Sequence, residues 1–310
     1  MDHLDLTTNV PFHSSVWIGT GKKFSHSLPK EVLEELQGVL EVPQIIRTSL
    51  PPPSTLVGEF IQWSPPFQSG SLSFHANTEW FSKDIPHTDP NSILTRSIPP
   101  RAVLRDLNRA IGQVWLDGYH SVVDPRFEDG MERFPLWVLS LWTEVQELIE
   151  SQNDWKRSIQ WLDSLTHPME IITQVKDMVL GLSWNQPLRL PGATSMDLTG
   201  FLGSLWLSDT QIDMMIGVLQ ERMKVKEYVE GTIIEPVALS QELVLVARGM
   251  KEPNSKYLSR LAGRIRRTDT KSLWFPIHVN GCHWIVGQVD FERHTFAFGE
   301  LFEHMTNDTN

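Results

Sequence analysis

The spacing of apolar residues changes along the chain, and each change predicts a different kind of element. After Pro99 the apolar residues fall three and four positions apart, which places one apolar stripe along a helix. The members of this stripe are Val103, Leu104, Leu107, Ala110, Ile111, Val114 and Trp115. Similar spacing predicts three further helices, over Pro135–Ser151, Asp154–Leu165 and Pro168–Leu182. The tryptophans in and beside these helices are expected to belong to a core.

Proline dominates the beginning of the chain, where 12 of the 20 prolines fall within the first 100 residues. Proline fixes φ and lacks a backbone donor, so long helices and central strands are disfavoured there. We therefore expect residues 1–98 to be irregular and in part disordered. Within them, the pattern indicates a short helix near Lys30–Leu40 and strands around Leu56–Trp63.

From about Leu205 a capped helix precedes a mixture of helices and strands. Ser208-Asp-Thr-Gln211 has the form of a capping box, in which the serine accepts from the N3 amide and the glutamine reaches back. A helix from Asp209 to about Lys226 follows from this. The later elements are a strand over Thr232–Val237, helices over Ser240–Gly249 and Asn254–Arg267, and strands over Leu273–Val279, Trp284–Asp290 and Thr295–Phe298. Glu292-Arg293-His294 is a candidate hairpin turn.

These patterns predict an α+β chain in four parts. Residues 1–98 form the Pro-rich region, and residues 99–184 form a mostly helical segment. Residues 185–204 contain several prolines and glycines and are interpreted as a linker. Residues 205–310 carry the mixed pattern of helices and strands.

Composition and charge make some classes of partner improbable. The 310 residues are 40% apolar and 21% charged, which is ordinary for a globular protein. The net charge is -11, so nucleic-acid binding is not expected, since phosphate contacts need clustered Lys and Arg. The one basic cluster comprises Arg264, Arg266, Arg267 and Lys271. It is interpreted as the solvated end of a helix.

The single cysteine, Cys282, allows no intramolecular disulfide and no cysteine-based zinc site. No apolar run reaches the length of a membrane span, and the N-terminus lacks the apolar region of a signal peptide. We therefore expect an intracellular protein without membrane contact. His87-Thr-Asp89 has the form of an iron-binding motif, but its Pro-rich surroundings offer no barrel of strands. We interpret it as a loop and expect neither a metal nor a cofactor.

One histidine is placed where it could take part in catalysis. His283 begins an apolar strand directly after a turn signal, Asn280-Gly281. If the next strand returns through a tight turn, Glu300 at its end comes back beside His283. A carboxylate in that position orients an imidazole and stabilises its protonated form. A histidine near a carboxylate is more often structural, so these residues leave both readings open.

Two longer motifs resemble those of the SUMO-protease family, the sentrin-specific and related ubiquitin-like-protein proteases. Trp274-Phe-Pro-Ile-His-Val-Asn-Gly-Cys-His283-Trp284-Ile-Val-Gly-Gln-Val-Asp290 resembles that family's catalytic-histidine strand. Upstream, Trp206-Leu-Ser-Asp209-Thr-Gln-Ile212 resembles the entry to the family's first helix. The resemblance covers roughly residues 205–302. It implies a papain-like α+β fold and a cysteine peptidase that cleaves after the Gly-Gly tail of SUMO or a related modifier. It is also the only indication that this intracellular protein is nuclear rather than cytoplasmic.

The resemblance also implies roles for individual residues. His283 takes the place of the general base, and Glu300 that of the acid that holds it. Trp206 and Trp284 take the places of two indoles that clamp the Gly-Gly tail, where a narrow aromatic tunnel excludes any Cβ. Asp209 is expected to cap its helix and also to touch the modifier. Asp290 is expected to be a turn residue at the end of a strand.

The chain departs from the family pattern at its end. The acid is glutamate where the family has aspartate, and it is followed by Leu301 where the family has serine. The family's nucleophilic cysteine lies further downstream, so we expect that this chain stops before it and that the domain is incomplete and inactive. Cys282 is not expected to substitute, because strand alternation points its side chain away from His283. Three readings stay open: a fragment of an enzyme, a non-catalytic modifier-binding remnant or scaffold, and an unstable structural half-domain.

Overall fold

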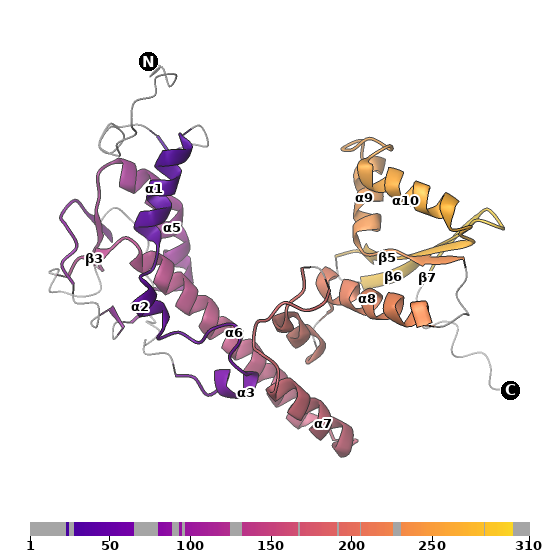
Figure 1. The fold of residues 1–310 in the computed structure, drawn as a ribbon, viewed down its shortest axis with the longest axis horizontal. Helices are drawn as coiled ribbons and strands as arrows, with labels where there is room; N and C mark the ends of the chain where they lie inside the picture. Colours follow the sequence, from indigo (N-terminus) through magenta and orange to yellow (C-terminus); the bar gives the residue numbers. More distant parts are fainter. Residues whose placement is uncertain are drawn as a thin grey trace, which may run out of the picture. The chain divides into compact units, whose positions relative to one another are not determined.

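The computed structural model describes residues 23–24, 28–64, 80–88, 93–94, 97–124, 132–166, 168–190, 192–204, 206–225, 231–281 and 283–299. Helices and two sheets make the chain α+β, as predicted from its sequence. The chain divides into two compact units, Met1–Asp154 and Trp155–Asn310. The division falls within the helix α6, Val138–Ser164, which contributes residues to both units (Figure 1).

The first unit combines helices with a small antiparallel sheet. Its elements are α1 (Lys30–Leu40), α2 (Gln44–Arg47), α3 (Val57–Phe60), β1 (Phe81–Ser82), α5 (Arg101–Leu116), β2 (Ser121–Val122), β3 (Phe134–Pro135) and the first part of α6. The three strands lie in the order β1-β2-β3. The bounds of α1 agree with the predicted helix, and α5 carries the predicted apolar stripe.

The core of the first unit is built on α5 and α6. The stripe on α5 is buried through Val103, Leu104, Leu107, Ile111 and Trp115. Asn108 on this helix donates to the Thr143 hydroxyl of α6 over 2.8 Å. On α6, Trp142 is fully buried and meets the ring of Phe134 edge-on, with 5.7 Å between ring centroids. These contacts agree with the prediction that helical tryptophans form a core.

Two expectations for secondary structure are wrong. The strands expected around Leu56–Trp63 are absent there, because the helix α3 occupies this segment and buries Val57 and Phe60 on one side. The two helices expected on either side of Gln152 are the single helix α6. The Gln152 side chain is buried and donates to the carbonyls of Phe60 (2.8 Å) and Trp63 (2.5 Å). Because its amide finds partners outside the helix, this polar residue does not interrupt α6.

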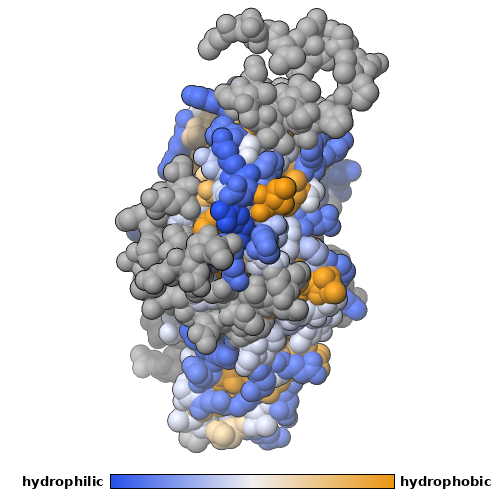
Figure 2. All heavy atoms as spheres, turned by 90° about the vertical axis from the view of Figure 1, so that its left-hand side faces the viewer, coloured by the Kyte–Doolittle hydropathy of each residue, from blue (hydrophilic) through white to orange (hydrophobic). Residues whose placement is uncertain are grey.

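Apolar residues on the surface are dispersed on the face that Figure 2 presents. There they form small patches separated by hydrophilic side chains (Figure 2). Exposed apolar side chains that are scattered singly are normal on proteins. Ile45 and Ile85 are two exposed apolar residues of the first unit. Over the described ranges, no helix has the length and hydropathy that a membrane span requires.

The second unit holds a larger sheet and the helices around it. Its elements after α6 are α7 (Met169–Leu180), the 3-10 helix η3 (Ser195–Phe201), α8 (Asp209–Val225), β4 (Thr232–Ile234), α9 (Ala238–Ala247), α10 (Lys256–Arg267), β5 (Ser272–Val279), β6 (His283–Asp290) and β7 (Thr295–Gly299). The segment interpreted as a linker contains η3, which begins with a capping box formed by Thr194 and Asp197.

The sheet has the order β4-β5-β6-β7, with β4 parallel to β5 and the other pairs antiparallel. The core on one face comprises Leu239 of α9, Leu261 of α10, and Leu273 and Phe275 of β5. The helices α9 and α10 therefore cover this face (Figure 1). We call it the core face. Side chains alternate along a strand, so every second residue of β6, beginning with His283, belongs to it.

Tight turns fix the register of the three antiparallel strands. Asn280 and Gly281 have φ values of 53° and 71°, the left-handed conformation that tight hairpin turns require. At the next turn, one carboxylate oxygen of Asp290 accepts from the amides of Glu292 (3.0 Å) and Arg293 (2.9 Å). Asp290 is thus a turn residue at the end of a strand, as predicted.

A buried carboxylate joins α10 to the sheet. Glu235, directly after β4, is 4% exposed and forms an ion pair with Arg264 of α10. It also accepts a hydrogen bond of 2.6 Å from the Tyr257 hydroxyl. A buried charge needs such partners to offset the loss of its hydration. Arg264, Arg266 and Arg267 lie in the last turn of α10 and are exposed, as predicted for a solvated helix end. The ion pair of Arg264 with Glu235 was not predicted.

Gly287 leaves space in β6 for two neighbouring side chains, and this predicts a steric effect. A Cβ at this position would lie 2.8 Å from Cδ1 of Ile277 and 3.0 Å from Cζ of Phe275. We expect Gly287→Ala to lower the free energy of unfolding by about 1–3 kcal/mol, because the core must repack around it. Equilibrium urea denaturation followed by circular dichroism measures this change.

Gly299→Ala is the matched control on the same sheet. Nothing lies within 4 Å of the position that its Cβ would take. This substitution should leave stability unchanged or raise it slightly, because alanine restricts the unfolded chain. Equal losses for the two variants would show that close packing around Gly287 does not limit stability.

Candidate functional site

Two segments that are far apart in sequence meet at the start of β6: one contains Trp206, and the other contains the consecutive residues His283 and Trp284. The ring of Trp206 lies edge-on to the ring of His283, with 6.1 Å between centroids and an interplanar angle of 87°. The next residue, Trp284, donates from Nε1 to the carbonyl of Leu207 over 2.8 Å. The ring of Trp284 also stacks on His278 of β5 at 4.5 Å. Each indole thus contacts a different imidazole.

The sheet register places these side chains on two faces. His283 pairs with Val279 and lies on the core face, whereas Trp284 pairs with His278 and lies on the opposite face. Trp206 contacts His283, and the next residue, Leu207, accepts the hydrogen bond from Trp284. The segment before α8 therefore contacts side chains from both faces of β6. Trp206 is 70% exposed, so its indole is available to a ligand.

The chain before α8 is held in place by the predicted capping motif. The Gln211 side chain accepts from the Ser208 amide over 2.8 Å and donates to the carbonyl of Asp197 over 2.9 Å. The first of these bonds, from the N-cap amide to the side chain at N3, is the one that the capping box predicts. The Ser208 hydroxyl differs from expectation, because it also bonds to the Gln211 side chain. These bonds fix the backbone next to Trp206.

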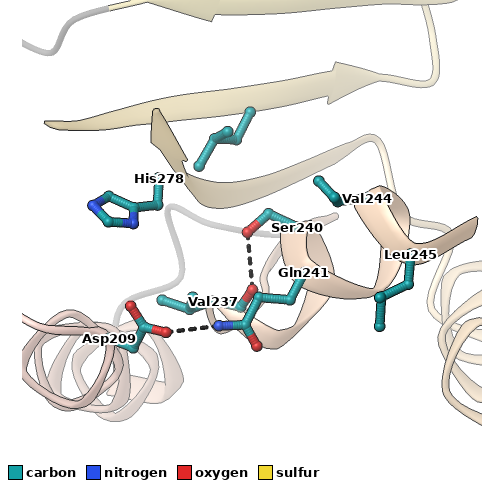
Figure 3. Close-up of a pocket in the computed structure, with 8 residues that line it drawn as sticks. Asp209, Val237, Ser240, Gln241, Val244, Leu245 and His278 are labelled. Atoms are coloured by element: carbon teal, nitrogen blue, oxygen red, sulfur yellow. Dashed lines mark hydrogen bonds between the residues drawn. The ribbon is translucent and has the colours of Figure 1, made fainter. Parts of the chain in front are cut away.

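A pocket of about 420 Å³ lies beside this group of aromatic side chains, between the start of α8, α9 and the end of β5. Its lining residues are Asp209, Val237, Ser240, Gln241, Val244, Leu245, Ile277 and His278. Asp209, the first residue of α8, accepts a hydrogen bond of 2.6 Å from the Gln241 side chain (Figure 3). His278 also lines the pocket (Figure 3). The pocket therefore combines an apolar floor with polar groups at one side.

Three titratable groups of the second unit have shifted pKa values. Burial raises the pKa of Asp213, and the nearby Asp209 carboxylate adds to the rise, although the hydrogen bond from the Val237 amide acts in the other direction. Burial also raises the pKa of Tyr257, with further contributions from the charges of Asp213 and Glu242. In contrast, hydrogen bonds from Lys251 and then Ser255 lower the pKa of Glu242.

The structure brings together Trp206, His283 and Trp284, and it places Asp209 at the neighbouring pocket. Glu300 and Cys282 lie outside the described residues, so the expected contact of Glu300 with His283 stays a prediction. Of the His87-Thr-Asp89 motif, Asp89 also lies outside them. His87 pairs with Arg133 in an isolated β-bridge, and its amide donates to the Arg133 carbonyl over 2.8 Å.

Sequence reasoning missed three polar residues of the pocket: His278, Gln241 and Ser240. His278 lies within the motif that carries the family resemblance, and its position opposite Trp284 follows once the register is known. No sequence pattern marked Gln241 and Ser240 as pocket residues, because their position in the pocket depends on how α9 packs near the start of α8.

Neither the grouping of possible metal ligands nor comparison with known proteins assigns a function to this site. In the part of the chain that the structure describes, no three His, Cys, Asp or Glu side chains are grouped so that they could hold a metal ion. The chain matches no protein-family model, no curated protein and no solved structure.

The raised pKa of Asp213 predicts a pH dependence of stability. Between the ordinary and the raised pKa, the folded protein binds more protons than the unfolded chain, so the free energy of unfolding falls as pH rises. Asp213→Asn removes this titration and keeps an oxygen for the Val237 amide, which now donates to Asp213 over 2.8 Å. We expect the variant to gain stability relative to the parent at pH 7 and to lose that gain toward pH 4. Urea denaturation across this pH range measures the difference.

Glu242→Gln should have the opposite sign. The lowered pKa of Glu242 contributes stability above the ordinary pKa of a glutamate, and this contribution disappears as pH falls through the lowered value. The variant should therefore lose stability at pH 7 and resemble the parent in acid. If both variants show the same pH dependence, the two carboxylates do not have the environments described.

Proposed function

We propose that the second unit belongs to the family of ubiquitin-like-protein cysteine proteases and binds the Gly-Gly tail of SUMO or a related modifier at Trp206, His283 and Trp284. The observation that carries this proposal is the edge-on contact of Trp206 with His283, which lie 77 positions apart in the sequence. The sequence resemblance assigned both residues to one site. In the structure their ring centroids lie 6.1 Å apart.

The exposure of Trp206 supports a binding role. A large indole that is 70% exposed is costly to leave in water, and such residues are enriched in binding sites. Other tryptophans of the chain, such as Trp80, Trp142 and Trp155, are in contrast almost fully buried. A chain of two glycines can lie close to an indole without steric conflict, whereas any Cβ would need additional space. Selection for glycine would therefore be steric.

The neighbouring pocket supports a ligand larger than a dipeptide. Asp209 and Gln241 present polar groups beside an apolar floor that includes Val244 and Leu245. A folded modifier whose tail lies at Trp206 would have its adjacent surface near this pocket. We propose that Asp209 contacts the modifier there, in addition to its place at the first turn of α8.

Peptide-bond cleavage in this family requires three groups: an imidazole, a carboxylate that orients it, and a thiolate. In this chain His283 would be the base, and Glu300 the acid. Cys282 is the one cysteine of the sequence, and its side chain is expected to point away from His283. We therefore propose that the 310-residue chain binds the modifier without cleaving it, and that its fold is the papain-like α+β type in an intracellular protein.

A second candidate is a binding module that takes no part in catalysis. The same observations favour it, because Trp206, Trp284 and the pocket require no nucleophile. The two candidates differ in whether a thiol completes the site, and thus in whether hydrolysis can be restored.

Binding of the modifier's tail provides the first test. We expect the full chain to bind a SUMO that ends in Gly-Gly, with at least about tenfold weaker binding when these glycines are replaced by alanines or removed. Trp206→Ala should weaken binding by about the same factor, because it removes the exposed indole. Isothermal titration calorimetry measures both effects.

Met178→Ala is the matched control, since Met178 on α7 is 72% exposed and lies outside the site. It should bind the modifier like the parent chain. Circular dichroism on each variant excludes unfolding as the cause. If SUMO with and without its glycines binds equally, or does not bind, the proposed tail site is wrong.

Hydrolysis is tested on a SUMO whose C-terminus carries a fluorogenic amide. We expect no release of the fluorophore by the parent chain or by Cys282→Ser. Release that Cys282→Ser abolishes would show that Cys282 acts as the nucleophile, which contradicts the orientation expected for its side chain.

A further inference from the structure

The strand β7 forms one edge of the larger sheet, and its five residues include none of the charges or prolines that usually protect such an edge. Among the described residues it pairs only with β6. All five of its residues are exposed, and the sequence Thr-Phe-Ala-Phe-Gly contains neither a charge nor a proline. Native proteins commonly place lysine, proline or a bulge on edge strands, because a flat apolar edge pairs with other chains.

Two phenylalanines extend the core face to this edge. Phe296 pairs with Val289 and Phe298 with Gly287, so both side chains lie on the core face. The ring of Phe296 stacks on Phe275 at 6.4 Å and lies 5.9 Å from Phe298. Yet Phe296 is 55% exposed and Phe298 is 69% exposed. This aromatic row, Phe275-Phe296-Phe298, therefore begins in the core and ends in solvent.

The strand is self-complementary about Ala297. If two copies pair antiparallel with a two-fold axis through Ala297, each Phe296 lies opposite Phe298 of the second copy. Both phenylalanine pairs then fall on the same face, and each joins the row of its own chain. The absence of charge on β7 removes local repulsion between two copies of a chain whose net charge is -11.

We propose that β7 is a homodimerisation edge, at which a second copy of this chain adds its β7 antiparallel in the register centred on Ala297. The two four-stranded sheets then form one continuous sheet across the axis. A two-fold interface uses the same surface on both copies, so pairing of the two β7 edges leaves neither free for a third chain. The expected product is therefore a discrete dimer. This inference does not depend on the proposed function of the site at His283.

The size of the surface sets the expected strength of the dimer. Phenylalanine side chains bury about 150–250 Å² each, so the exposed parts of Phe296 and Phe298 offer roughly 200 Å² per copy. Stable interfaces usually bury about 800 Å² per partner. We therefore expect a weak dimer whose population depends on protein concentration in the micromolar range or above.

Cysteine cross-linking tests the register directly. In a Cys282→Ser background, Ala297→Cys places the two new thiols opposite each other at the axis, with about 4.5–5.5 Å between Cα atoms. This separation lies within the range of disulfides. We expect Ala297→Cys to give a disulfide-linked dimer under mild oxidation, seen on a non-reducing gel.

Thr295→Cys in the same background is the matched control. Thr295 lies on the same face as Ala297, two residues away, and is also exposed. In the proposed register Thr295 lies opposite Gly299 of the second copy. Thr295 of the second copy is four residues, or about 13 Å, further along that strand, which is too far for a disulfide. Equal cross-linking of the two variants, or none by Ala297→Cys, overturns the proposed register.

Sedimentation velocity of the parent chain across a concentration series tests the dimer itself. Phe298→Lys should weaken dimerisation by about tenfold or more, because two lysines would enter the apolar row. Met178→Lys, at a site of similar exposure on α7, should leave it unchanged. A parent chain that stays monomeric at all concentrations, larger oligomers, or a dimer insensitive to Phe298→Lys contradicts the proposal.

Discussion

The antiparallel register of β5 and β6 is the constraint on which the second unit depends. It runs without interruption from Ser272 opposite Asp290 to Val279 opposite His283. A shift by one residue would exchange the two faces of β6, so that His283 would leave the core face and Trp284 would enter it. The same shift would remove Gly287 from the position where Phe275 and Ile277 need its space. Core packing and the candidate site are thus fixed by one pairing.

Much of the fold could be predicted because the local patterns are strong. The stripe on α5, the capped start of α8 and the apolar runs of β5 and β6 each correspond to an observed element. Failures occurred where a short segment is decided by distant partners. Leu56–Trp63 has a short apolar run that suits either a strand or a helix, and burial of Val57 and Phe60 selects the helix. The sequence predicts a break between Ser151 and Asp154, but the helix continues through this interval. The Gln152 side chain within it bonds to the carbonyls of Phe60 and Trp63, which lie 92 and 89 residues away.

The candidate site was predictable only in its aromatic part. Trp206, His283 and Trp284 belong to two motifs with recognisable residue types. The structure brings Trp206 into contact with His283 and the neighbouring Leu207 into contact with Trp284. The pocket next to them was not predictable, because its walls come from α8, α9 and β5 and its shape depends on their packing. The ion pair of the buried Glu235 with the half-exposed Arg264 was missed for the same reason, because it forms only when α10 lies on the sheet.

The hydrogen bond from Trp284 to the Leu207 carbonyl has a consequence for the order of folding. The β5–β6 hairpin closes a loop of a few residues, so it can form in microseconds from local interactions alone. The Trp284 bond, in contrast, closes a loop of 77 residues, and its entropy loss is correspondingly larger. We expect the hairpin to form first and the contact between the start of α8 and β6 to form later. The contacts of Trp206 and Trp284 are then among the last native contacts to form and among the first to open. The fraction of molecules in which these contacts are formed therefore responds to small changes in stability elsewhere in the unit.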